Sequence, residues 1–128
     1  MTNSLTIDLT PALWLSANRP IKNFGQKARI VRAIHELVID CAKDQHLAPV
    51  TGRYIASWVI HYPKGVGWVH GDASNAHPTC KAALDALVPD WLPGDGPRFI
   101  AEERYRRGVN LTEPRWHRVV LNLMEVLA

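Results

Sequence analysis

The stretch GQKARIVRAIHELVIDCAKDQHLAPVTGRYIASWVIHY, residues 25–62, decides the fold because its hydrophobic pattern changes partway along it. In residues 25–46 the apolar side chains recur at helical spacing and form one stripe, which consists of Ile30, Ile34, Leu37, Val38 and Cys41. After Pro49 and Gly52, residues 53–62 are apolar and rich in aromatic and β-branched side chains, which is typical of a strand covered on both faces. The sequence therefore predicts an amphipathic helix followed by a buried strand.

Elements of the same two kinds flank this stretch. In chain order, the sequence predicts a strand at residues 5–10, a loop at 14–24, the helix at 25–46, a strand at 53–62, a helix at about 78–88 and strands at 98–107 and 117–127. Asn75 or Thr79 is expected to cap the second helix, and residues 108–114 are expected to join the last two strands as a hairpin. The order β-α-β-α-β-β predicts an α+β fold, a small mixed sheet with two main helices on one face.

The size and composition indicate one globular domain. With 128 residues and 47% hydrophobic content, the chain has enough apolar material for a single core and is too short for two ordinary domains. It does not open with a basic and apolar leader, and nowhere do eighteen apolar residues run together, so a secreted or membrane-spanning protein is not expected. Cys41 and Cys80 lie among apolar residues at helical spacing, which favours buried, reduced thiols and a cytoplasmic location.

The net charge of the chain is small, but the charges are unevenly distributed. Fifteen Lys and Arg against twelve Asp and Glu give a net charge of +3, which alone does not indicate a nucleic-acid partner. Basic residues gather at 19–32 and again at 98–118, whereas acids dominate the part of the chain between them. Acidic residues within a basic frame suit a metal-dependent nuclease, in which the frame holds phosphates and the acids hold the metal ion.

The stretch HGDASNAHPTCKAALDALVPDWLPGDG, residues 70–96, carries the candidate chemistry. Asp72 follows a glycine-broken strand end, Lys81 and Asp85 are four residues apart on one side of the second helix, and Asp95 lies in the loop after it. These three carboxylates could converge on Mg²⁺, which needs only one or two carboxylates besides water and phosphate. Lys81 would then neutralise charge on the phosphate in the transition state. On spacing alone, turn aspartates and an ordinary Lys81–Asp85 surface pair are the plainer interpretation.

The same stretch resembles the signature of the RusA-like Holliday junction resolvases. In that resemblance Asp72 matches the first acidic ligand, Asn75 the Asn, Lys81 the catalytic lysine, residues 85–87 the helical Asp-Ala-Leu, and Asp95 the last acidic ligand. The segment at residues 16–19 is similar to the family's N-terminal Ser/Asn loop, and the likeness covers nearly the whole chain.

The chain departs from the family pattern at two points. Ser74 stands where the family has its second Asp, and three extra residues separate Asn75 from Lys81. A variant subgroup from phages and actinobacteria shares the Asp-x-x-Asn and Pro-Thr-x-Lys-Ala runs, and this chain looks like that subgroup. Either Asp85 supplies the missing charge or activity is reduced.

The resemblance implies a Mg²⁺-dependent endonuclease that works as a homodimer on four-way DNA junctions and nicks two symmetric strands. Asp72, Asp85 and Asp95 would bind the metal, and together with Lys81 they would form the catalytic set. The side chains expected to contact DNA are one Trp from a glycine-broken segment and six cations, namely Trp68, Arg19, Lys22, Lys27, Arg104, Arg106 and Arg107. Val120, Met124 and Val126 suit either the dimer interface or the core.

Two other functions fit parts of the pattern. Because Ser74 removes a carboxylate, the alternative function is a non-catalytic accessory protein that binds DNA junctions. His70, His77 and Cys80 also have a spacing that suits a zinc-stabilised interaction module, with His61 as a possible further ligand.

Overall fold

The structure is a computed structural model that describes residues 1–65 and 71–126. Its elements are, in chain order, β1 (Ser4–Leu9), the short 3₁₀ helix η1 (Pro11–Leu13), α1 (Phe24–Asp44), β2 (Tyr54–His61), the 3₁₀ helix η3 (Ala73–Ala76), α2 (His77–Ala86), β3 (Ile100–Arg107) and β4 (His117–Glu125). Strands and main helices follow the predicted order β-α-β-α-β-β, so the α+β fold is confirmed. Across the described ranges, no helix has both the length and the apolar character that crossing a membrane requires.

The four strands form one mixed sheet in the order β1-β4-β2-β3. Strand β4 is antiparallel to both of its neighbours, whereas β3 runs parallel to β2. The predicted hairpin through residues 108–114 is therefore wrong, because β2 lies between β3 and β4. Charged side chains crowd β3 and suit an edge strand, whereas alternating buried residues in β4 suit the middle of the sheet.

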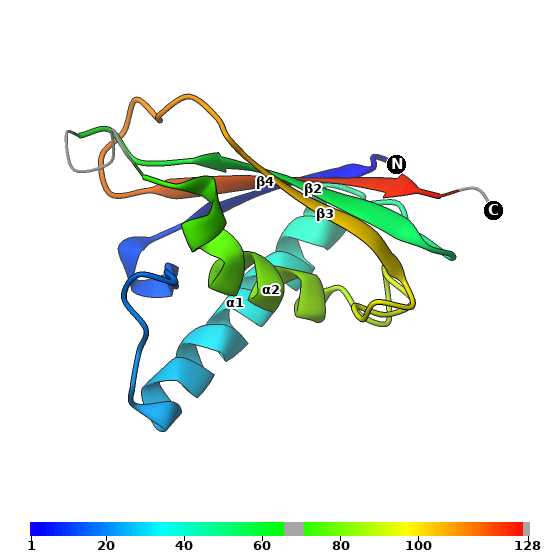
Figure 1. The fold of residues 1–128 in the computed structure, drawn as a ribbon, viewed down its shortest axis with the longest axis horizontal. Helices are drawn as coiled ribbons and strands as arrows, with labels where there is room; N and C mark the ends of the chain where they lie inside the picture. The colour runs from blue at the N-terminus through cyan, green and yellow to red at the C-terminus, as the bar shows by residue number, and fades with distance from the viewer. Residues whose placement is uncertain (66–70, 127–128) are drawn as a thin grey trace.

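Both helices lie against the same face of the sheet (Figure 1). Along β2 the buried residues alternate with half-buried ones, and the buried set is Tyr54, Ala56, Trp58 and Ile60. The prediction that this strand is covered on both faces is thus wrong, since the helices cover only one. Val120 of β4, half-buried, and Met124, 60% exposed, lie on the open face rather than in the core.

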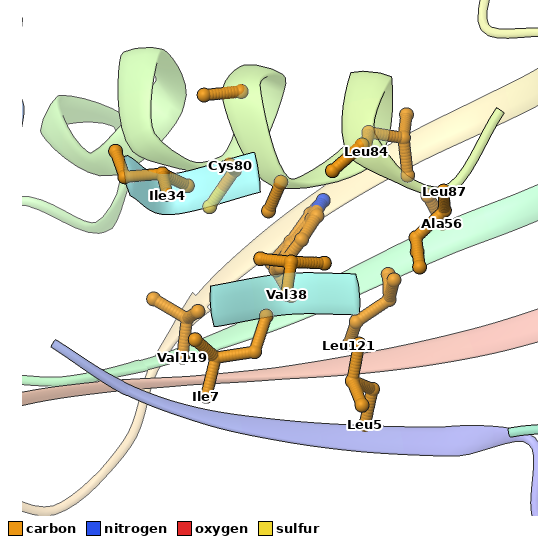
Figure 2. Packing of buried hydrophobic residues seen from close by; sticks show 14 of the residues in the cluster. Leu5, Ile7, Ile34, Val38, Ala56, Cys80, Leu84, Leu87, Val119 and Leu121 are labelled. Carbon is orange, nitrogen blue, oxygen red and sulfur yellow. The ribbon is translucent and has the colours of Figure 1, made fainter. Parts of the chain in front are cut away.

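The hydrophobic core lies between the helices and the sheet (Figure 2). Ile34 and Val38 from the predicted stripe of α1 are fully buried, as are Leu84 and Leu87 at the end of α2. Their side chains pack towards alternate residues of the strands, which include Leu5, Ile7, Val119 and Leu121. Cys80 is 1% exposed in this cluster, which confirms that its thiol is buried, whereas Cys41 is only half-buried, and both thiols are free.

The first turns of the two helices differ in how they are stabilised. The Asn23 side chain caps α1 by accepting a hydrogen bond of 2.9 Å from the backbone N–H of Gln26. Helix α2 has no side-chain cap, so the prediction that Asn75 or Thr79 caps it is wrong. Thr79 is instead fully buried, and its hydroxyl accepts from Leu15 N and donates to Leu15 O, both at 2.8 Å. These bonds fix the N-terminal loop against α2.

A buried histidine makes the stability of this fold dependent on pH. His117, 2% exposed, stacks on Trp14 with ring centroids 3.9 Å apart, and burial lowers its pKa from 6.5 to about 4. The unfolded chain therefore binds more protons between these values, and stability present above pH 6.5 falls as the pH falls towards 4. We expect the free energy of unfolding to drop by about 3 kcal/mol over this window because of His117.

Urea unfolding at several pH values measures this effect. The variant His117→Phe keeps an aromatic ring but cannot titrate, so its free energy of unfolding should fall much less with acidification. An equally steep fall in that variant would show that other groups cause the pH dependence.

Candidate active site

Helix α2 and the loop after it bring three of the predicted residues into contact. Lys81 and Asp85 lie one turn apart on the exposed side of α2, and the Lys81 ammonium is 2.6 Å from Asp85 Oδ1. The same ammonium is 2.7 Å from Asp95 Oδ2. One cation is thus shared by two carboxylates that lie ten residues apart in the chain. We call Lys81, Asp85 and Asp95 the α2 cluster.

The loop that carries Asp95 is held by a contact from β2 and by the Phe99 ring, which lies just before β3. The buried ring of Tyr54 reaches it from β2, and the Tyr54 hydroxyl donates a 2.7 Å hydrogen bond to Gly94 O. Gly94 packs so closely on the Phe99 ring that any larger residue would collide with it. Substituting Gly94 would therefore displace the segment that presents Asp95.

The two carboxylates of the α2 cluster have opposite pKa shifts. Partial burial and the neighbouring Asp95 raise the pKa of Asp85, whereas hydrogen bonds with Asp85 and Lys81 lower the pKa of Asp95 to about 2. Hydrogen bonds to both carboxylates also raise the pKa of Lys81. Asp85 is thus the carboxyl that takes up a proton first, while Asp95 keeps its charge.

The charge of a further carboxylate, Glu103, acts on Tyr54, the residue that holds the Asp95 loop, and the sequence alone did not reveal it. Burial raises the pKa of Tyr54, and the negative charges of Asp95, Glu103 and Asp85 raise it further. Glu103 therefore lies near the same tyrosine as the α2 cluster. Its position on the helix-covered side of β3 follows from the pairing of Glu103 with Ala56 and of Tyr105 with Trp58. Once β3 is known to pair with β2, the alternation of side chains along β3 predicts that Glu103 lies on this side.

Asp72 does not join the α2 cluster. Its backbone carbonyl accepts a 2.5 Å hydrogen bond from the hydroxyl of Tyr62, which lies just after the end of β2. Asp95, in contrast, follows Gly94, which is bound by Tyr54 at the start of β2. The Cα atoms of these two tyrosines, eight residues apart along extended chain, are separated by about 26 Å. Within the described ranges, no three His, Cys, Asp or Glu side chains form a group that could hold a metal ion.

The expected convergence of Asp72 with Asp85 and Asp95 within one chain is therefore not found. The cause is the parallel pairing of β2 and β3. Asp72 follows the end of β2 and Asp95 precedes the start of β3, and in a parallel pair these points lie at opposite ends of the sheet.

The predicted DNA contacts fall into groups on different surfaces. Arg19, Lys22 and Lys27 are all exposed, in and just after the loop that leads into α1. Arg104 and Arg106 point to the open face of the sheet, since they pair with Ser57 and Val59 of β2. Arg104 also forms an ion pair with Glu102 at 2.8 Å. Trp68 lies outside the described residues.

The half-buried Arg107 side chain binds other parts of this chain. Its guanidinium donates to Gly71 O and, at 2.7 Å, to Asn110 Oδ1, and it lies 4.9 Å from the ring centre of Tyr62. It thereby links the segment before Asp72 to the loop after β3. This residue orders the chain around Asp72 rather than presenting an unengaged cation.

The residues of the zinc interpretation do not form a site in the described part of the chain. The His77 Nδ1 atom lies 2.9 Å from the Tyr105 hydroxyl at the protein surface. Cys80 lies in the core, where burial raises its thiol pKa well above the ordinary value. His70 lies outside the described residues.

Comparison with protein-family models and with curated proteins finds no match to this chain.

Removing the shared ammonium is expected to change the titration of both carboxylates. In Lys81→Ala the pKa of Asp95 should rise from about 2 towards its ordinary value of 3.8, because the ammonium that helps to stabilise its charged form is gone while its hydrogen bond with Asp85 remains. Carbon NMR of the aspartate carboxyl groups across a pH titration measures this shift. Lys43→Ala, which removes an exposed lysine from the end of α1, is the control and should leave Asp95 unchanged. An unaltered Asp95 titration in Lys81→Ala would contradict the contact.

Proposed function

We propose that this protein is a Mg²⁺-dependent, structure-selective DNA endonuclease that acts in the cytoplasm as a homodimer and resolves four-way junctions by paired nicks. The observation that carries the proposal is the α2 cluster, in which Lys81 lies within 2.7 Å of both Asp85 and Asp95. The proposal also rests on the resemblance of residues 70–96 to RusA-like resolvases.

The α2 cluster fits a divalent cation with two protein carboxylates. Asp85 and Asp95 already direct oxygen atoms at one positive charge, the ammonium of Lys81. Mg²⁺ prefers such hard oxygen ligands and completes its shell with water and substrate phosphate, so two carboxylates suffice. The cluster is also accessible to DNA, since the side chains of Asp85 and Asp95 are 36% and 33% exposed.

Each side chain of the cluster has a distinct role in phosphodiester cleavage. Asp85 and Asp95 would be the two protein ligands of the metal ion, and the lowered pKa of Asp95 means that its carboxylate is charged at neutral pH. Bound Mg²⁺ would supply polarisation of the scissile phosphate and lower the pKa of the attacking water. Lys81, 48% exposed on a flexible stem, can move its ammonium from the carboxylates to the phosphate and stabilise the charge that builds there.

Asp72 cannot act together with the α2 cluster of its own chain. Within one chain it lies too far from the α2 cluster to share a cation with it. In the proposed homodimer it could share one only with the α2 cluster of the second copy. Val120 and Met124 on the open sheet face provide apolar surface for an interface between copies.

Cleavage of a synthetic four-way junction tests the proposed function. With Mg²⁺, purified protein should nick two strands of the junction at symmetric positions, and it should leave a linear duplex of the same sequence intact. Chelation of the metal should abolish the nicks without releasing the DNA. Tight binding to the junction without any Mg²⁺-dependent nick would contradict the endonuclease proposal.

A non-catalytic junction-binding protein is the second candidate function. Two observations favour it, namely Ser74 in place of a carboxylate and the engagement of both Asp85 and Asp95 by the Lys81 ammonium. This candidate predicts that the junction affinity is the same with and without Mg²⁺ and that no strand is cut.

A further inference from the structure

The first turns of α1 extend away from the rest of the protein. The helix begins at Phe24, but its first fully buried residue is Ile34. Every residue from 22 to 29 is exposed, and the ring of Phe24 is 92% exposed. In Figure 1 this end of α1 points away from the sheet and past α2. We call residues 19–32 the α1 tip.

Phe24 lies on the side of α1 that faces the core farther along the helix. Positions seven residues apart lie on nearly the same side of an α-helix, so Phe24 aligns with Val31 and Val38. Val38 is fully buried and Val31 is half-buried, whereas Phe24 lies beyond the end of the core and is exposed. A single exposed hydrophobic residue is common on protein surfaces, so this position alone does not identify a binding partner.

The charges around Phe24 identify the chemistry of a partner. All five charged residues of the α1 tip are basic and exposed, namely Arg19, Lys22, Lys27, Arg29 and Arg32. No Asp or Glu occurs anywhere between Asp8 and Glu36. The five cations exceed the whole net charge of +3, so the remainder of the chain is slightly acidic. A cluster of cations without acidic neighbours attracts a polyanion.

The α1 tip is attached to the protein at fixed points. The loop before it is anchored by the Leu15–Thr79 hydrogen bonds and by a 3.0 Å bond from Ala17 N to Asn75 O. The Asn23 cap then fixes where the helix starts. Phe24 is therefore presented from an ordered helix end, which limits the conformational entropy lost on binding.

We propose that the α1 tip binds DNA at unpaired bases, where the Phe24 ring stacks on an exposed base and the surrounding cations contact the flanking phosphates. Aromatic stacking on bases combined with backbone contacts is how proteins bind unpaired nucleotides without reading sequence. This inference rests on the proposed function for the identity of the polyanion. It adds a selectivity for DNA with accessible bases that neither the α2 cluster nor phosphate contacts supply.

Equilibrium binding in the presence of a chelator tests the α1 tip separately from catalysis. The probes are a fluorescent duplex with a short internal run of unpaired bases and a fully paired duplex of equal length. Phe24→Ala should weaken binding to the first probe by about tenfold and leave binding to the paired duplex unchanged. Phe24→Trp should restore the preference. Val109→Ala, which truncates another exposed hydrophobic side chain outside the α1 tip, is the matched control and should behave like the wild type.

The cations of the α1 tip should affect both probes alike. Replacing Lys27, Arg29 and Arg32 together by Ala should weaken binding to both probes. It should also reduce the salt dependence by about 0.9 in the log–log slope for each DNA phosphate that the protein no longer neutralises. An unchanged slope would overturn the phosphate part of the proposal.

Two results with Phe24→Ala would overturn the stacking proposal. One is an equal loss, or no loss, of affinity for the two probes. The other is a changed oligomeric state in sedimentation with unchanged DNA affinity, which would assign Phe24 to a contact between copies of the chain. Failure to cleave a junction with Mg²⁺ would reject the endonuclease but leave these binding results intact.

Discussion

Replacing Asp95 by Asn is expected to abolish Mg²⁺-dependent cleavage of a four-way junction while junction binding persists. Asp95 is one of the two carboxylates of the α2 cluster, and its lowered pKa means that it carries a negative charge available to a cation. The neutral amide has the same shape, so the loop held by Tyr54 should remain in place. We expect the rate of nicking to fall by more than about 100-fold, since loss of even outer-shell partners of a metal costs about 10–100-fold.

Asp90→Asn is the matched control for this prediction. Asp90 lies exposed in the same segment after α2 but takes no part in the α2 cluster, so its amide variant should cut at the wild-type rate.

Asp72→Asn should also lose cutting and keep binding if Asp72 serves the α2 cluster of a second copy. In that case a mixture of the Asp72→Asn and Asp95→Asn variants should regain nicking. A dimer of one copy of each variant has one intact site, which combines Asp72 of the Asp95→Asn copy with the α2 cluster of the Asp72→Asn copy. Full cutting by Asp95→Asn would refute the role of the α2 cluster.

Trp58→Ala is expected to cause the largest loss of stability. Among the residues that the structure describes, Trp58 is the largest fully buried side chain, and it lies on β2 between Tyr105 of β3 and Leu121 of β4. Truncation leaves a cavity at the centre of the sheet and should lower the free energy of unfolding by about 3–5 kcal/mol. Urea denaturation followed by circular dichroism measures the change. Ser57→Ala on the open face of the same strand should change it by less than about 1 kcal/mol, and a similarly small effect for Trp58→Ala would contradict the described packing.

The helices and strands of this fold could be predicted from the sequence because local patterns determine them. The stripe through Ile34 and Val38 predicted α1, and the run before Tyr62 predicted β2. The pairing of the strands could not be predicted, because a hairpin between β3 and β4 satisfies the same local patterns. The charged composition of β3 was the available signal that it belongs at the sheet edge.

The candidate site could be predicted only in part for the same reason. The spacing of Lys81 and Asp85 is a property of one helix, and the structure shows their contact. The place of Asp72 depends on whether β2 and β3 are parallel, which no local pattern reveals. Glu103 was missed because its relation to Tyr54 arises from that same pairing.

Paramagnetic broadening by Mn²⁺, used in place of Mg²⁺, tests most directly whether the α2 cluster binds a divalent cation. In amide NMR spectra of the full chain, small additions of Mn²⁺ should broaden the signals of Asp85 and Asp95 first, and Asp95→Asn should remove the effect. Sharp signals at both residues, or broadening centred on another part of the protein and unchanged in Asp95→Asn, would contradict a metal site at the α2 cluster.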